Sequence, residues 1–184
     1  MTIREEAFAG KALSCPIIDA HTHIGPYHLN GWHQKYDRTG TEQIVEDFTR
    51  LGINCIVTSP HPMVQTRMRE ANALAAEAAR KFPGKIYGYI TIVPICGMEE
   101  VKREIQKYRD DSSFIGLKFL TGYHGEIDQP EYLYALDFAD EVGCPVLCHV
   151  WGDIPKRRGF ADVLRTRHSM KLVIAHQGAT DQVM

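Results

Sequence analysis

Short apolar segments recur six times along this chain, separated by amphipathic segments, and this order restricts the fold more than any other feature. The apolar segments are typical of strands and span residues 16–21, 54–59, 85–93, 114–119, 145–151 and 171–176. Between them, apolar residues recur at spacings of three and four, which predicts helices over residues 41–52, 64–82, 101–108, 130–143 and 160–167. The strand segments are continuous apolar runs, as expected when both faces of a parallel sheet are covered.

Two architectures fit parallel strands connected by helices: a doubly wound sheet and a (β/α) barrel. A doubly wound sheet that binds nucleotides carries a glycine-rich phosphate turn after a strand. Neither GxGxxG nor GxxxxGK[ST] occurs in this sequence. The first strand ends instead in His-Thr-His. We therefore predict an α/β fold of the (β/α)8 TIM-barrel type, in a single domain over residues 1–184.

The predicted barrel is incomplete. A full barrel has eight units in about 250 residues, whereas this chain has 184 residues and about six units. Three explanations stay open. The chain is a C-terminally truncated fragment, or a second copy or another chain completes the barrel, or the sheet stays open with unpaired edges that favour aggregation.

Composition excludes several partners. The formal net charge of −2 gives no electrostatic reason to expect nucleic acid or an anionic membrane. No run approaches the ~20 apolar residues of a membrane span, and the N-terminus does not resemble a signal peptide. The five cysteines include no CxxC pair, which favours buried free thiols in a reducing compartment. We therefore expect a cytoplasmic protein that acts on a small molecule.

Four histidines lie at the ends of three predicted strands. His21 and His23 are two residues apart in the first strand, so they are expected to project to the same face. His149 lies near the end of the fifth strand and His176 at the end of the sixth. The carboxyl ends of barrel strands are where barrel enzymes keep their chemistry. The shared position therefore predicts a metal site.

The strand segments resemble those of the amidohydrolase superfamily, and more closely its amidohydrolase-related (amidohydrolase 2) branch of metal-dependent TIM-barrel hydrolases and decarboxylases. The matching segments are IIDAHTHIG, FIGLKF, PVLCHVWG and KLVIAHQGA. The resemblance implies that His21, His23 and His149 hold the metal. It implies that His176 is the catalytic general acid/base or the ligand of a second metal. The family's last ligand, an aspartate that ends the eighth strand, has no counterpart in these residues, so we expect the chain alone to turn over poorly.

Two further residues lie close to this predicted site. Lys118, in the fourth strand, occupies the position where some superfamily members carry a carboxylated lysine that bridges two metals. The alternative, which single-metal sites in this branch favour, is a lysine that holds a substrate anion or a carboxylate of the protein. Asp19 precedes His21 by two residues and is expected either to brace the site from behind the ligands or to make a hydrogen bond at the strand end.

Aromatic and histidine side chains elsewhere suggest a substrate pocket. The segment 24–40 is longer than the ~2–6 residues usual for a connection between strand and helix. It is either a lid over the substrate or an oligomer contact. The residues predicted to line the pocket are His28, Trp32, His61, His124 and Trp151. The alternative for His61 and His124 is that they only shape the turns after their strands.

Neutral imidazoles with an open coordination position suit Zn²⁺, and Mn²⁺, Fe²⁺ and Co²⁺ are compatible with the same ligands. Such an ion lowers the pKa of bound water to about 7 and polarises a carbonyl. The function expected first is hydrolysis of an amide, lactone or ester. One alternative is non-oxidative decarboxylation of an aromatic or unsaturated acid. Another is an inactive fragment or binding module.

Overall fold

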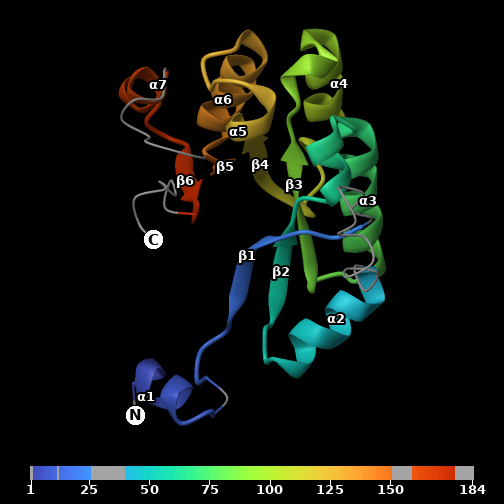
Figure 1. Ribbon diagram of the computed structural model, residues 1–184, viewed down its shortest axis with the longest axis vertical. Coiled ribbons are helices and arrows are strands. Elements are labelled where there is room, and N and C mark those ends of the chain that lie inside the picture. The colour runs from blue at the N-terminus through green and yellow to red at the C-terminus, as the bar shows by residue number, and fades with distance from the viewer. Residues whose placement is uncertain (1, 12, 26–39, 151–158, 177–184) are drawn as a thin grey trace.

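The computed structural model describes residues 2–11, 13–25, 40–150 and 159–176. Six parallel strands form one sheet in the order β1-β2-β3-β4-β5-β6. Their bounds are β1 Ile18–Thr22, β2 Cys55–Thr58, β3 Ile86–Thr91, β4 Phe114–Leu120, β5 Pro145–His149 and β6 Lys171–Ala175. The sheet curls into a half-barrel (Figure 1). The predicted fold class, an incomplete barrel of the TIM type, is confirmed.

Helices connect successive strands, and the longer ones lie along the outer side of the curled sheet (Figure 1). They are α2 Thr41–Arg50, α3 Met68–Lys81, α4 Met98–Tyr108, α5 Thr121–His124, α6 Pro130–Val142 and α7 Phe160–Thr166. Two short 3₁₀ helices, η2 His61–Gln65 and η3 Pro94–Cys96, follow β2 and β3. A first helix, α1 Ile3–Phe8, stands apart near the N-terminus and buries none of its residues.

The helix boundaries follow local chemistry. Helix α6 begins with Pro130, whose fixed φ suits a first turn, and ends before Gly143, which adopts a φ of 71° that a side chain would disfavour. The helix predicted over residues 64–82 begins four residues later than expected, at Met68. Val64 belongs to η2, which begins at His61 with Pro62 in its first turn and ends before Thr66, whose φ is 63°. Sequence periodicity did not reveal this interruption.

The main hydrophobic core lies between the outer face of the sheet and the helices. It includes Leu117 and Phe119 of β4, and the Phe119 ring stacks on Tyr132 of α6 with centroids 4.4 Å apart. A smaller cluster on the inner face contains Val57, Tyr89, Leu147 and Ala175. Burial on both faces is the reason that the strand segments read as continuous apolar runs.

The two edge strands differ in regularity. β6 pairs with β5 over five successive residues without interruption. β1 pairs Asp19 with Ile56 and Thr22 with Thr58, so its register shifts by one residue between these pairs. The irregularity lies at Ala20 and His21, so it includes one of the predicted metal ligands.

Within the described ranges, no helix is long and apolar enough to cross a membrane. All five cysteines are free, as predicted, but only Cys148 is buried. The other four are partly exposed, so the expectation of buried thiols is wrong for them.

Candidate metal centre

The curl of the sheet brings side chains from four strand ends together at one mouth. The ring centroids of His21 and His23 are 5.1 Å apart, and those of His21 and His176 are 5.2 Å apart. His149 and His176 lie closer, at 4.6 Å, and His176 Nε2 is 3.1 Å from His149 Nδ1. Lys118 Nζ lies 3.1 Å from His21 Nε2. The four predicted histidines and Lys118 therefore form one cluster.

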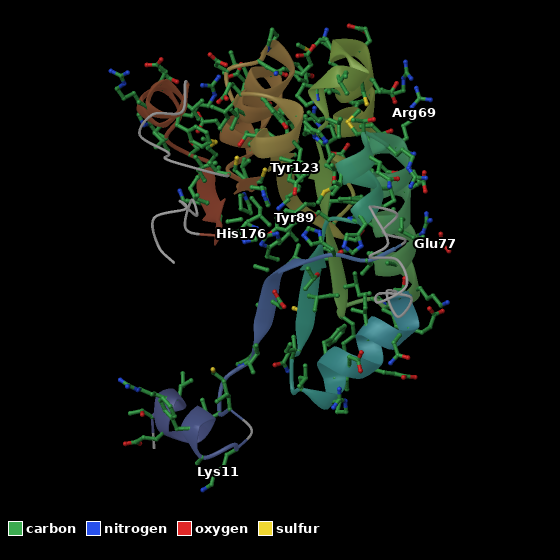
Figure 2. All side chains as sticks on the ribbon, viewed as in Figure 1. Lys11, Arg69, Glu77, Tyr89, Tyr123 and His176 are labelled. Atoms are coloured by element: carbon green, nitrogen blue, oxygen red, sulfur yellow. The ribbon has the colours of Figure 1, made fainter. Side chains whose placement is uncertain are left out.

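Figure 2 shows the position of this cluster within the fold. His176, Tyr89 and Tyr123 lie toward the inner side of the curled sheet, whereas Lys11, Arg69 and Glu77 lie at the periphery.

A backbone carbonyl fixes the protonation of His23. Its Nδ1 is 2.6 Å from the Ser59 carbonyl oxygen, which can only accept a hydrogen bond. Nδ1 therefore carries the proton, and Nε2 keeps a lone pair. His61 repeats the arrangement with the Gly25 carbonyl at 3.0 Å, and its ring lies 5.3 Å from that of His23.

Burial keeps the imidazoles neutral. It lowers the pKa of His23 to about 3, although the Ser59 hydrogen bond opposes the shift. Burial, with Lys118 and then His176 as further causes, lowers the pKa of His21 to about 4. Burial and the neighbouring His176 lower the pKa of His149 to about 4. Neutral imidazoles are the form that ligates a metal ion.

Lys118 is fully buried, and its burial lowers its pKa to about 8. No ion pair to Lys118 occurs within the part of the chain that the structure describes. A buried ammonium group without an ion pair is costly, and a bound anion would offset this cost.

The donor set and its spacing fit a divalent ion. Two imidazoles bound at about 2.0–2.1 Å to one tetrahedral ion place their ring centres roughly 5 Å apart, close to the separations found here. Among the described residues, no three His, Cys, Asp or Glu side chains are already arranged around one point. His21 Nε2 faces Lys118, and His149 Nδ1 faces His176. Binding of an ion would therefore require these rings to turn.

Asp19 acts on the backbone of β1. Its Oδ1 accepts a hydrogen bond from the His21 N–H at 3.0 Å. Tyr89 of β3, which sequence reasoning missed, donates its hydroxyl to the Ala20 carbonyl at 3.0 Å. The sequence offered little signal for this contact, because Tyr89 reads as one more apolar residue of a strand and the contact spans 69 positions.

Two of the five residues predicted to line the pocket, His61 and His124, lie among the described residues. His61 lies beside His23, as described above. His124 is half-buried at the end of α5, close to the backbone of Val64. Tyr123, which was not predicted, places its ring 5.4 Å from that of His149. His28, Trp32 and Trp151 lie outside the described residues.

The curled parallel sheet, with its histidines at the carboxyl ends of the strands, defines a protein of the TIM-barrel class. The chain belongs to the amidohydrolase family, whose family model matches residues 18–183. The resemblance inferred from the strand segments is thereby confirmed. A search of curated proteins found no match.

Solved structures with a similar fold include two dihydroxybenzoate decarboxylases. The 2,6-dihydroxybenzoate decarboxylase from Rhizobium aligns with a TM-score of 0.66 at 15% identity, over 89% of this chain and 67% of its own. The enzyme from Polaromonas, solved with manganese and the inhibitor 2-nitroresorcinol, aligns at 0.64 and 17%, over 89% and 66% of the two chains.

A third structure, 5-carboxyvanillate decarboxylase from Novosphingobium aromaticivorans with bound manganese, aligns at 0.62 and 17% identity. It covers 74% of this chain and 51% of its own. The chain thus spans about half to two thirds of the length of these structures. At such low identity the likeness shows a shared fold.

Proposed function

We propose that these residues carry most of the active site of a metal-dependent decarboxylase that acts on aromatic carboxylic acids. The observation that carries the proposal is the meeting of four imidazoles and one buried amine at a single mouth. The similar folds of three decarboxylases of hydroxylated benzoic acids favour decarboxylation over the hydrolysis expected first from the sequence.

His21, His23 and His149 are the residues that would hold the ion. When bound, a divalent ion there supplies Lewis-acid polarisation of a substrate oxygen. Two of the similar structures contain manganese, so Mn²⁺ joins Zn²⁺ as an ion to test. The second-metal alternative for Lys118 and His176 stays open in the same test.

Lys118 would hold the substrate's anionic group. Its amine lies 3.1 Å from His21 Nε2, so an anion that accepts a hydrogen bond from Lys118 would lie beside this proposed ligand. Such an anion would compensate a charge that is otherwise costly to bury. An aromatic acid bound in this way would have its anionic group directed toward Lys118.

His176 would supply the proton. His176 is exposed to solvent, so it can exchange protons with water, and its ring contacts that of His149. In decarboxylation the bond between the ring carbon and the carboxylate breaks, and CO₂ leaves. A proton adds to the same ring carbon, so that Ar–COO⁻ and H⁺ give Ar–H and CO₂. A histidine placed as general acid suits this step.

Hydrolysis is the second candidate, because the matching family is described as amidohydrolase. In that reaction the same site would direct water at an amide, lactone or ester carbonyl. His176 would then accept the proton of the attacking water.

The test compares the two reactions in this chain and in a chain extended through an eighth strand. CO₂ release from 2,6-dihydroxybenzoate and 5-carboxyvanillate is measured with Mn²⁺ or Zn²⁺, beside a panel of amides, lactones and esters. We expect CO₂ release by the extended protein, dependent on metal. Hydrolysis alone would support the second candidate, and metal binding without either reaction would support a binding module.

A matched pair of variants tests the role of Lys118. Lys118→Met should lose CO₂ release, whereas Lys102→Met, which changes a lysine on the surface of α4, should not. Equal rates in the two variants would contradict the assignment of Lys118.

A further inference from the structure

The direction of His21 depends on a local irregularity of β1. Asp19 of β1 pairs with Ile56 of β2, and Thr22 pairs with Thr58. Two residues of β1, Ala20 and His21, therefore lie opposite the single residue Val57. An extra residue of this kind bends a strand and re-aims the side chain that it carries. Regular alternation along the strand therefore does not fix where the His21 ring points.

Two side chains support this irregular point. The Ala20 carbonyl accepts a hydrogen bond from the Tyr89 hydroxyl, and the His21 N–H donates to the Asp19 carboxylate, both at 3.0 Å. Tyr89 belongs to β3, so its side chain reaches past β2 to make this contact. Both polar groups of the single peptide that joins Ala20 to His21 are thus bonded to side chains.

Tyr89 is well placed to transmit rigidity. It is only 4% exposed and packs in the inner cluster with Val57, Leu147 and Ala175. A buried hydroxyl is expected to keep a hydrogen bond, and the only freedom of an anchored tyrosine ring lies in two torsions. The hydroxyl therefore ties the bend of β1 to the packed interior of the half-barrel.

We propose that Tyr89 is a positioning residue for the metal centre, acting through the backbone of β1 to aim His21. The inference rests on the metal binding proposed above. Tyr89 does not contact the ligand rings in this role. It limits the conformations of the segment from which one ligand projects.

Tyr87 provides a matched control. It lies two residues earlier on the same strand and packs against the same inner cluster, opposite Val57 in the ladder. Within the described residues its hydroxyl makes no hydrogen bond to β1. Tyr87→Phe therefore removes an equivalent oxygen from the same face without touching the support of His21.

The experiment measures the dissociation constants of Zn²⁺ and Mn²⁺ by competition with a chromogenic chelator. Loss of a group that orients a ligand typically weakens metal binding by about 10–100-fold. We expect Tyr89→Phe to show a loss in this range and Tyr87→Phe to bind as the wild type does. The thermal midpoints of the two metal-free variants should be similar. Equal affinity of Tyr89→Phe and wild type would overturn this inference alone, whereas no binding by the wild type would overturn the metal site as well.

A double-mutant cycle shows whether Tyr89 acts through His21. In a His21→Ala background, Tyr89→Phe should cause no further loss of affinity, because the ligand that it positions is absent. In a His149→Ala background the loss should persist. Equal losses in both backgrounds would indicate a general loosening of the site and overturn the proposal.

A second route covers the case in which Tyr89→Phe folds poorly. Asp19→Ala removes the other support of the irregular point, and Asp19→Asn keeps an oxygen that can accept the His21 N–H. We expect weakened binding in Asp19→Ala and recovery in Asp19→Asn. Unchanged binding in Asp19→Ala would show that the irregular point does not need support from side chains.

Discussion

The central strands and the edge strands of this sheet differ in how they are held. β3, β4 and β5 are covered by helices on the outer face, and the residues of β4 from Gly116 onward are buried. The edges are more open, since Ile18 of β1 is 61% exposed and Val173 of β6 is 47% exposed. The candidate ligands are divided between these regions. His21 and His23 lie at one edge strand, and His176 follows the other. His149 lies in β5, one of the three central strands that form the wall of the half-barrel.

This division separates stability from chemistry. Burial of apolar surface in the wall supplies most of the driving force for folding. The histidines at the edges instead depend on particular hydrogen bonds. His23 donates its Nδ1–H to the Ser59 carbonyl, and the His21 backbone N–H donates to the Asp19 carboxylate. Substitutions at the edge should therefore change metal binding more than stability, and substitutions in the wall should do the reverse.

The largest expected effect is loss of the metal. Replacing His21 and His23 together by Ala removes two of the three proposed ligands and should abolish binding in an assay of metal content. His176→Asn, at the opposite edge, should retain the metal. Equal metal content in the double variant and the wild type would refute the ligand assignment.

The next effect concerns turnover. If His176 is the proton donor, His176→Asn in a catalytically competent extended protein should lose roughly 10²–10⁴-fold in rate while keeping its metal. Loss of about half of the bound metal would instead identify His176 as the ligand of a second ion. An unchanged rate would remove it from the mechanism.

A smaller effect separates the wall from the edge by stability. Leu117 is fully buried in β4, and Leu117→Ala should lower the free energy of unfolding by about 2–5 kcal/mol. Val173→Ala, on the exposed edge, should change it by less than about 0.5 kcal/mol. Denaturant unfolding of the metal-free variants measures both values. Similar losses would show that β6 is more tightly held than its exposure indicates.

The sequence predicted the wall better than the site. Continuous apolar runs locate buried strands well, and all six predicted strands are present, with ends displaced by only a few residues. The interruption before α3 was missed because it depends on Pro62 and on the positive φ of Thr66. Helices α1 and α5 were also missed, since each is too short to show a period.

At the site, the strand ends identified which histidines would meet, but not how they would be oriented. Alternation predicts that His21 and His23 project together, whereas the irregularity at Ala20 requires knowledge of the tertiary contact with Tyr89. The cytoplasmic location, the small-molecule substrate and the expected oligomer or completing partner stay predictions.

The smallest expected effect tests how β6 is held at the end remote from the metal. Asp140 of α6 accepts hydrogen bonds from the backbone N–H groups of Met170 and Ser169, at 3.0 and 2.7 Å, immediately before β6. These bonds, that of Met170 first, lower the pKa of the Asp140 carboxyl below its ordinary value. Because the pKa is lower in the folded state, the charged carboxylate stabilises the fold at neutral pH. That contribution is lost as the pH falls from about 4 through the folded-state pKa.

Asp140→Ala should therefore lower the thermal midpoint at neutral pH, and its difference from wild type should shrink below about pH 4. Glu141→Ala, at an exposed neighbouring position of the same helix, is the control and should change little. Metal affinity should be unaffected by Asp140→Ala, in contrast to Asp19→Ala, because the uninterrupted ladder with β5 also holds β6 up to Ala175, next to His176. A fall in metal affinity in Asp140→Ala would mean that both edges, and not β1 alone, need local hydrogen bonds to place their histidines.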